Sequence, residues 1–228
     1  MQDPTITEME LSDYLEVLTR NGEQLSVLID DILDLSKVEA GLLTYEHRDF
    51  DPAQVCNEVV SLFKAKAKGQ NLKLEFVKDP STPERVMTDP TRLRQIMMNL
   101  VSNALKFTRV GGVTITSSGI DVEGNNRLAI EVNDTGLGVP TEHAERIFDM
   151  FVQGDDSMTR KFGGTGIGLS LSRQLARELG GNLELLRSEQ GHGSTFRVSV
   201  LNQPKETAEV RESAGVESSI DQSKVSLD

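Results

Sequence analysis

Residues 89–108 read DPTRLRQIMMNLVSNALKFT, and this stretch decides how the rest of the chain folds. Asp89 can cap a helix and Pro90 suits a first helical turn, so a helix is predicted to begin here. Its apolar residues recur at helical spacing and make one core-facing side. They are Leu93, Ile96, Met97, Leu100, Val101 and Leu105. The stretch therefore predicts an amphipathic helix that lies against the core of a domain.

One side of this helix is polar. Asn99 and Asn103 are four residues apart and Lys106 follows one turn later, so the three share that side. A carboxamide oxygen is a hard ligand suited to Mg²⁺, and a lysine suits a phosphate. An exposed polar face would explain this helix alone equally well, because short motifs match by chance. Two glycine-rich stretches further along favour the functional interpretation.

Composition limits the classes of function. The chain has 228 residues, of which 37% are hydrophobic and 4% aromatic, which indicates one sizeable domain with an aliphatic core plus an appendage. The net charge of -12 argues against a nucleic-acid partner, and it means that a bound polyphosphate needs local cations. Cys56 is the single cysteine and is interpreted as a core residue, which fits a reducing cytosol. No signal peptide or long apolar run occurs, so we expect a soluble, cytoplasmic chain without membrane contact of its own.

The patterns along the chain predict a domain of helices and strands between a long helix and a polar tail. We expect helices at 7–40, 51–68, 89–108 and 166–179, and weak helical character at 140–151. We expect strands at 43–50, 72–77, 85–88, 113–120, 127–132, 182–187 and 194–201. A mobile loop is predicted at 152–164. The division is a long helix at 1–41, a domain at 42–202, and a polar linker or disordered tail at 203–228.

The first of these regions carries a heptad seam. Its apolar residues follow alternating steps of four and three, with Gly22 in the one remaining core slot. They are Leu11, Leu15, Leu18, Leu25, Ile29 and Ile32. Leu28 and Leu35 widen the face, which suits a four-helix bundle. One helix cannot bury such a face, so a partner helix is expected from another chain or from further sequence.

The first glycine box, NDTGLGVP at 133–140, directly follows a predicted strand. Asp134 at the strand end can accept a hydrogen bond from an exocyclic amine such as that of adenine. Gly136 and Gly138 allow the backbone to approach a flat ring closely. An ordinary Asp-Gly turn is the alternative, and for this box alone it is favoured at roughly 60%.

The second glycine box, FGGTGIGLS at 162–170, runs straight into the predicted helix at 166–179. Its glycines free the loop, and the first helical N–H groups can face a phosphate. It is not a Walker pattern, and no βαβ unit frames it as a dinucleotide box. Arg160 and Lys161 precede it, where a loop that closes on phosphates would carry its cations. A flexible linker is the weaker alternative, because the box leads into an amphipathic helix.

Two smaller features complete the set. The third box, GHGSTF at 191–196, is either a hairpin turn or a place where Thr195 bonds Asp134 or a water beneath adenine. Phe148 and Phe151 bracket the sequence FDMF, and aromatic residues at such spacing are more often core than functional.

In this order, the boxes and the long helix closely resemble the sensor histidine kinases of two-component systems, of the hybrid type. The resemblance covers about residues 11–201, and DILDLSKVEAG resembles the end of the second dimerisation helix that precedes the kinase domain. It implies a Bergerat ATP-binding fold of the GHKL superfamily: an α/β (α+β) two-layer sandwich with a mixed sheet backed by helices, after one long bundle helix. It also implies ATP and Mg²⁺ as cofactors.

The resemblance assigns roles residue by residue. Asn103 would be the magnesium ligand, and Lys106, Arg160 and Lys161 would act on the phosphates. Asp134 would bind adenine, above a floor made by Gly136 and Gly138. The full set of implied cofactor-binding residues is Asn99, Asn103, Asp134, Gly136, Gly138, Gly164, Thr165, Gly166, Gly168, Leu169 and Thr195.

One departure from the family concerns the phosphoacceptor. The family carries its histidine on the first dimerisation helix, but the histidines here are His47, His143 and His192, and none lies in the long helix. We therefore expect no self-phosphorylation and a histidine on missing upstream sequence or on another chain. The implied partners are that histidine-bearing helix and the receiver domain of a response regulator. The implied full-length parent is a homodimer that could be membrane-anchored.

Two alternatives from other classes remain at this point. A non-catalytic, nucleotide-dependent interaction module is motivated by the missing histidine, although the intact Asn99, Asn103 and Lys106 argue against it. Another ATPase of the same superfold, such as a gyrase-like or chaperone-like domain, is disfavoured by the long helix and the acidic charge. Appreciable ATP hydrolysis without a histidine acceptor would favour that second alternative.

Overall fold

The computed structural model describes residues 8–122, 124–150 and 166–202. Its helices are α1 (Glu8–Glu39), α2 (Pro52–Gly69), α3 (Pro90–Phe107) and α5 (Gly168–Glu178), and two 3₁₀ turns are η1 (Thr141–His143) and η2 (Arg146–Phe148). Its strands are β1 (Arg48–Phe50), β2 (Lys73–Lys78), β3 (Val86–Thr88), β4 (Gly112–Val122), β5 (Asn125–Asp134), β6 (Asn182–Glu189) and β7 (Gly193–Leu201).

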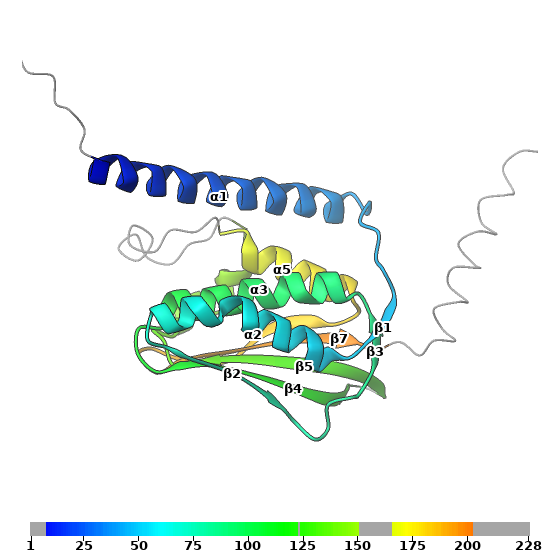
Figure 1. Ribbon diagram of the computed structural model, residues 1–228. Coiled ribbons are helices and arrows are strands. Elements are labelled where there is room, and N and C mark those ends of the chain that lie inside the picture. The colour runs from blue at the N-terminus through cyan, green and yellow to red at the C-terminus, as the bar shows by residue number, and fades with distance from the viewer. Residues whose placement is uncertain (1–7, 123, 151–165, 203–228) are drawn as a thin grey trace, which may run out of the picture.

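The domain is a two-layer sandwich. A five-stranded sheet has the order β2-β4-β5-β7-β6, in which β2 runs parallel to β4 and the other neighbours are antiparallel. The helices α2, α3 and α5 cover one face of this sheet (Figure 1). The expected mixed sheet backed by helices is therefore confirmed.

The core lies between the sheet and the helices. The two-residue repeat of the strands and the helical repeat of α3 explain which side chains enter it. In β5, Leu128, Ile130 and Val132 alternate with residues on the other face and are buried. The helix α3 contributes its whole apolar side, including Leu93 and Ile96, to the same core cluster. Burying such a side chain contributes roughly 2 kcal/mol, so these two periods together hold α3 on β5.

The strand expected at 43–50 and the weak helix expected at 140–151 differ most from the structure. The strand expected at 43–50 begins only at Arg48, since β1 pairs solely with the three residues of β3. Residues 43–47 instead run towards the start of α3, where the Glu46 N–H donates to the Asp89 carboxylate at 3.0 Å. The weak helix at 140–151 is present as the 3₁₀ turns η1 and η2. The predicted mobile loop and tail fall on residues 151–165 and 203–228, which lie outside the described residues.

The long helix α1 lies over the helical layer and extends past the domain (Figure 1). Its C-terminal end is attached to that layer by Leu35 and Val38, which are buried. The Asp34 carboxylate accepts from Arg92 Nη1 at 3.1 Å and from Gln95 Nε2 at 2.8 Å, both on α3. These contacts tie the last turns of α1 to α3.

The predicted seam on α1 is open in the described chain. Its six apolar residues are 41–66% exposed: Leu11, Leu15, Leu18, Leu25, Ile29 and Ile32. Leu28 is half-buried and Leu35 is buried, so the widened part of the face turns towards the domain. The partner helix expected for the seam stays a prediction.

The buried Asp89 side chain anchors the start of α3, and its removal should be costly. Its Oδ1 accepts from the N–H groups of Thr91 and Arg92 while Oδ2 holds the Glu46 N–H. Asp51, which caps α2 through the Ala53 N–H alone, is the matched control. We predict that Asp89→Ala lowers the free energy of unfolding by about 2–3 kcal/mol and Asp51→Ala by about 1 kcal/mol, measured by urea denaturation. Equal losses would contradict the double role of Asp89.

Candidate functional site

The polar side of α3 forms the centre of the candidate site. Asn99, Asn103 and Lys106 are all half-buried. Asn103 Nδ2 donates to Asn99 Oδ1 at 3.2 Å, and Asn99 Nδ2 donates to the hydroxyl of Ser172 on α5 at 2.9 Å. Because the nitrogen of Asn103 is used in this way, its Oδ1 is the atom left to meet a ligand. The two carboxamides are therefore adjacent, as predicted from their spacing.

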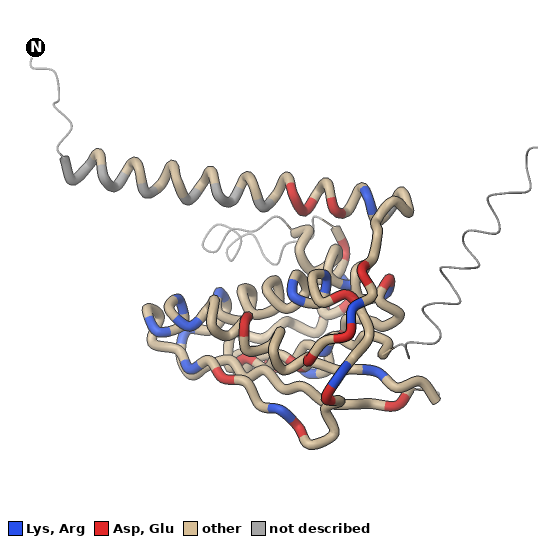
Figure 2. The backbone as a smooth tube through the Cα atoms, turned by 45° about the vertical axis from the view of Figure 1, so that its right-hand side comes forward, with Lys and Arg blue, Asp and Glu red and all other residues tan. Residues whose placement is uncertain are grey.

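Lys106 is a cation in a partly buried position. Its Nζ lies 4.9 Å from the centre of the Phe107 ring. Burial lowers the pKa of Lys106, and the nearby Lys66 of α2 lowers it further. Figure 2 shows basic residues where α2 ends, and its last turn carries Lys66 and Lys68. A bound anion would relieve this repulsion, so this end of the helical layer is suited to phosphate despite the acidic chain.

Asp134 lies at the end of β5 and faces the helical layer. It continues the two-residue period of Ile130 and Val132, whose side chains are in the core. Its Oδ1 accepts from the Gly136 N–H at 2.8 Å, and the Ser194 N–H is the second backbone donor that acts on this carboxyl. Burial raises the pKa of Asp134, and these two N–H groups oppose the rise. The arrangement leaves a buried carboxylate oriented by backbone donors.

The loop after Asp134 packs tightly between the end of α3 and the β6–β7 hairpin. The Leu137 N–H donates to the Phe107 carbonyl at 3.2 Å. A Cβ on Gly136 would lie 2.6 Å from that same carbonyl oxygen and 2.8 Å from Asp134 Oδ1. Gly138 has a φ of +69°, and a Cβ there would collide with the Glu189 carbonyl. The two glycines are therefore required by the close approach of the backbone.

The N-terminus of α5 completes the site from the other side. A Cβ on Gly168 would lie 2.5 Å from Asn99 Oδ1, so this helix starts in direct contact with the asparagine side of α3. Gly166 precedes it with a φ of +71°, and Leu169 packs against the core. The first N–H groups of α5 thus begin beside Asn99.

The structure brings most of the predicted residues to one place around α3. The loop after Asp134 joins the C-terminal end of α3 through Phe107, and Gly168 joins its middle through Asn99. The remaining predicted residues lie outside the described part of the chain and stay predictions: Arg160, Lys161, Gly164 and Thr165.

Of the alternatives for the third box, the hairpin turn is present between β6 and β7, and no bond from Thr195 to Asp134 is found among the described residues. The Thr195 hydroxyl accepts from Asn133 Nδ2 at 2.7 Å. The physical reason is register, because Asn133 and Thr195 are paired across β5 and β7 and share the outer face of the sheet. The side chain of Ser194, one residue earlier, has the opposite phase, and the Ser194 N–H helps to lower the pKa of Asp134.

Two further contacts were not anticipated from the sequence. The Phe107 carbonyl holds the loop after Asp134, and the Ser172 hydroxyl holds Asn99. Ser172 is a buried hydroxyl one turn after Gly168 on an amphipathic helix, which was the available signal. Phe148 confirms the expectation of a core aromatic: its ring packs edge to face on Phe196 with centroids 6.3 Å apart.

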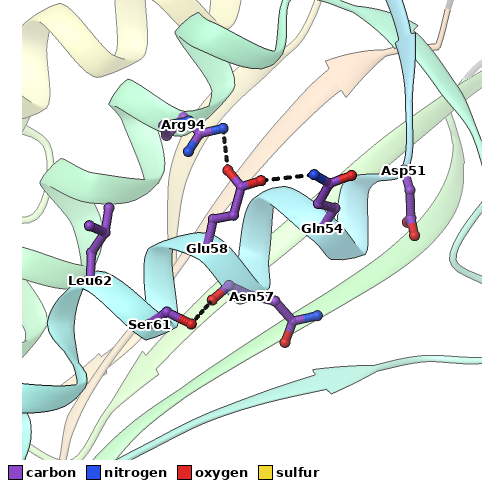
Figure 3. Close-up of a pocket in the computed structure, with 7 residues that line it drawn as sticks. All are labelled: Asp51, Gln54, Asn57, Glu58, Ser61, Leu62 and Arg94. Atoms are coloured by element: carbon purple, nitrogen blue, oxygen red, sulfur yellow. Dashed lines mark hydrogen bonds and ion pairs between the residues drawn. The ribbon is translucent and has the colours of Figure 1, made fainter.

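An open groove of about 790 Å³ between α2 and α3 is a separate feature (Figure 3). Figure 3 shows that Glu58 bridges Arg94 and the Gln54 amide across it. None of the predicted site residues lines this groove. Its one basic residue, Arg94, already pairs with Glu58, and Asp51 caps α2, so no cation there is left for a polyphosphate.

The sequence places the chain in a known family. A family model described as histidine kinase-, DNA gyrase B-, and HSP90-like ATPase matches residues 88–204. The match spans more than half of the chain and includes α3, the Asp134 loop and α5. The chain therefore belongs to this family of ATP-binding domains.

Individual relatives point to histidine kinases. The chain is 36% identical over 185 residues to the signal transduction histidine-protein kinase BarA of Escherichia coli strain K12, which covers 81% of this chain and 20% of BarA. Full-length ShkA in complex with AMPPNP shares the fold with a TM-score of 0.73 at 29% identity, over 88% of this chain and 40% of ShkA. Histidine kinase ThkA in complex with the response regulator protein TrrA gives a TM-score of 0.63 at 27% identity, over 90% of this chain and 54% of that chain.

The matched relatives are much longer than this chain. The chain spans about a fifth of the length of the curated relatives that it matches. Among the described residues, no helix is both long and apolar enough to span a membrane.

Gly138 and Gly191 allow the cost of a steric collision to be measured apart from the cost of backbone strain. Gly138 and Gly191 both have positive φ, but a Cβ on Gly191 would meet nothing within 4 Å. We predict that Gly191→Ala lowers the free energy of unfolding by about 1 kcal/mol, whereas Gly138→Ala lowers it by about 3 kcal/mol, because only Gly138 also forces the hairpin away. Thermal unfolding of the two variants measures this, and similar losses would contradict the close packing of the Asp134 loop.

Proposed function

We propose that this chain is the ATP-binding catalytic part of a histidine protein kinase, which transfers the γ-phosphoryl group of Mg-ATP to a histidine for relay to a response regulator. The observation that carries the proposal is the convergence on α3 of two carboxamides, a lysine, the Asp134 loop and the start of α5. The relatives named as histidine kinases and the ShkA complex with AMPPNP support it.

In this proposal Asp134 selects adenine. Its buried carboxylate has Oδ1 held by the Gly136 N–H and can still accept from an exocyclic amine. Gly136 and Gly138 allow the loop beside Asp134 to pack closely, since a Cβ at either position would collide with a backbone carbonyl. Asp134, Gly136 and Gly138 therefore bind and orient the base.

The donor set fits a magnesium ion. Asn103 Oδ1 has no hydrogen-bond partner among the described residues, and it is a neutral hard oxygen of the kind that Mg²⁺ binds together with phosphates. Asn103 is thus the proposed metal ligand, with Asn99 beside it. When bound, the metal supplies neutralisation of the charge on the phosphates.

The phosphates are assigned to the cations and the glycine-rich segment. Lys106 is the described cation beside the asparagines, and Arg160 and Lys161 are proposed to approach the γ-phosphate. Gly164, Thr165, Gly166, Gly168 and Leu169 are proposed to form the phosphate-facing hinge. Catalysis by these groups is positioning together with charge neutralisation, as is general for phosphoryl transfer. For Thr195, a role at the nucleotide is less supported, because its hydroxyl is bonded to Asn133.

The acceptor is proposed to be a histidine on a helix that pairs with the α1 seam. That seam is exposed along its length, and α1 contains no histidine. The helix would come from further sequence or another chain, within a homodimeric parent. A receiver domain is the proposed next partner, supported by the complex of ThkA with the response regulator TrrA.

A nucleotide-dependent interaction module is the second candidate function. The seam favours it, because an exposed apolar face can recruit a partner without any catalysis. Nucleotide binding does not separate the two candidates, whereas phosphoryl transfer does.

Nucleotide binding is predicted to depend on Asp134. An Asp134→Asn variant keeps a single side-chain oxygen, which would have to serve the Gly136 N–H and the adenine amine together. We expect calorimetry to show Mg-ATP binding by the parent chain and an affinity lower by at least about tenfold for Asp134→Asn, the loss of roughly one charged hydrogen bond. Asp121→Asn, in the distant β4–β5 hairpin where it holds the Gly124 N–H, is the control and should bind as the parent does. Failure of the parent to bind with magnesium present would sink the proposal.

Phosphoryl transfer is predicted to require a supplied acceptor. With γ-labelled ATP and magnesium, the chain alone should carry no acid-labile, alkali-stable label, because no histidine lies on α1. A polypeptide with a histidine on a helix complementary to the α1 seam should become labelled, and Asn103→Ala should abolish the labelling. Nucleotide binding without any such transfer would favour the interaction module.

A further inference from the structure

We propose that Ser172 is a positioning residue for the magnesium site: its hydroxyl orients Asn99, and through Asn99 it presents the Asn103 carboxamide oxygen to the metal. This inference rests on the proposed function of Asn103. It adds a residue from α5 that lies outside the glycine-rich box and touches neither metal nor nucleotide. The three side chains form a line of hydrogen bonds from Ser172 Oγ to Asn99 at 2.9 Å and from Asn99 to Asn103 at 3.2 Å.

Orientation matters because the two ends of a carboxamide have nearly the same shape and opposite polarity. For Asn103 to turn its oxygen towards a cation, its nitrogen must point away and find an acceptor. Asn99 Oδ1 is that acceptor, and it is available only if Asn99 turns its own nitrogen the other way. Ser172 Oγ accepts from that nitrogen. The polarity of the whole line is therefore correct for a cation at Asn103.

The surroundings of Asn99 make Ser172 the decisive acceptor. Ser172 is 3% exposed, so water competes poorly for the bond. Gly168 lies one turn earlier on the same side of α5, and a Cβ there would lie 2.5 Å from Asn99 Oδ1. One face of α5 thus contacts Asn99 with a hydroxyl at one position and with a close backbone at the other.

Removal of the Ser172 hydroxyl should weaken magnesium binding and leave adenine binding unaffected. Without Ser172 Oγ, the Asn99 nitrogen would lie against α5 without its acceptor, and the amide would gain by rotating. Its oxygen would then leave Asn103 Nδ2, and Asn103 would lose its fixed orientation. Asp134 and its loop do not contact this line, so adenine binding should be unaffected. Residues that orient metal ligands from behind typically change metal affinity in this manner.

The test compares Ser172→Ala with Ser170→Ala on the whole chain. Ser170 is also buried on α5, but its hydroxyl donates to the Ile167 carbonyl at 2.7 Å and does not contact the asparagines. Calorimetry measures the affinity for ATP over a range of Mg²⁺ concentrations. The quantity compared is the Mg²⁺ concentration at which half of the magnesium-dependent gain in ATP affinity is reached. We expect Ser172→Ala to raise this concentration by about fivefold, the worth of one hydrogen bond, while ADP binding without metal changes by less than about twofold. Ser170→Ala should leave both values unchanged.

A second measurement needs no nucleotide. In proton–nitrogen correlation spectra of the free chain, the side-chain NH₂ signals of Asn99 and Asn103 report their hydrogen bonds. Ser172→Ala should shift both pairs of signals, and Ser170→Ala should shift neither. Ser172→Thr, which keeps an acceptor oxygen, should restore the signals and the magnesium dependence.

The outcomes separate this inference from the proposed function. If the parent chain binds Mg-ATP but Ser172→Ala leaves the magnesium dependence unchanged, the positioning role is wrong and the proposed function stands. Equal loss of ADP and magnesium response would make Ser172 a general structural residue and would also overturn the inference. If the parent chain does not bind Mg-ATP at all, the metal role of the line fails together with the proposed function, even where the amide signals shift.

Discussion

The complete burial of the apolar side of α3 is the constraint on which the site depends. Leu93, Ile96, Met97, Val101 and Leu105 are fully buried, each contributing roughly 2 kcal/mol. Successive residues of a helix are turned by about 100°, so a shift of α3 by one residue would move these side chains out of the core. The direction of the polar side is therefore fixed by the core, without any ligand. The hydrogen bonds on the polar side then orient side chains whose position on α3 is already fixed by the core.

The same logic extends from α3 to the elements that surround it. The phase of β5 that buries Ile130 and Val132 also turns Asp134 towards the helices. Backbone contacts then place the flanking loops against α3. The Leu137 N–H bonds the carbonyl at the end of α3, and the Gly168 backbone lies against Asn99. In a chain with a net charge of -12, Lys66 and Lys106 give this end of the helical layer a local positive charge, which suits the proposed polyphosphate. Core packing thus positions a polar site of mixed charge.

Features with a local period could be predicted from the sequence, and features that depend on tertiary contact could not. The spacing of Asn99 and Asn103 on one helix side followed from helical geometry, whereas the two-layer architecture was implied by the resemblance to histidine kinases. The bond between Thr195 and Asn133 could not be predicted from the sequence, because the phase of β7 against β5 depends on register. Ser172 was missed because its role exists only once α5 packs on α3. The roles assigned to Arg160 and Lys161 stay predictions.

A crystal structure of this chain with Mg²⁺ and the ATP analogue AMPPNP tests the central claim most directly, because it shows base and metal at once. The account predicts the adenine amino group within hydrogen-bond distance of an Asp134 carboxylate oxygen. It also predicts Asn103 Oδ1 among the ligands of the magnesium ion. Adenine bound away from Asp134, for example in the groove between α2 and α3, or a metal without contact to Asn103, would contradict it.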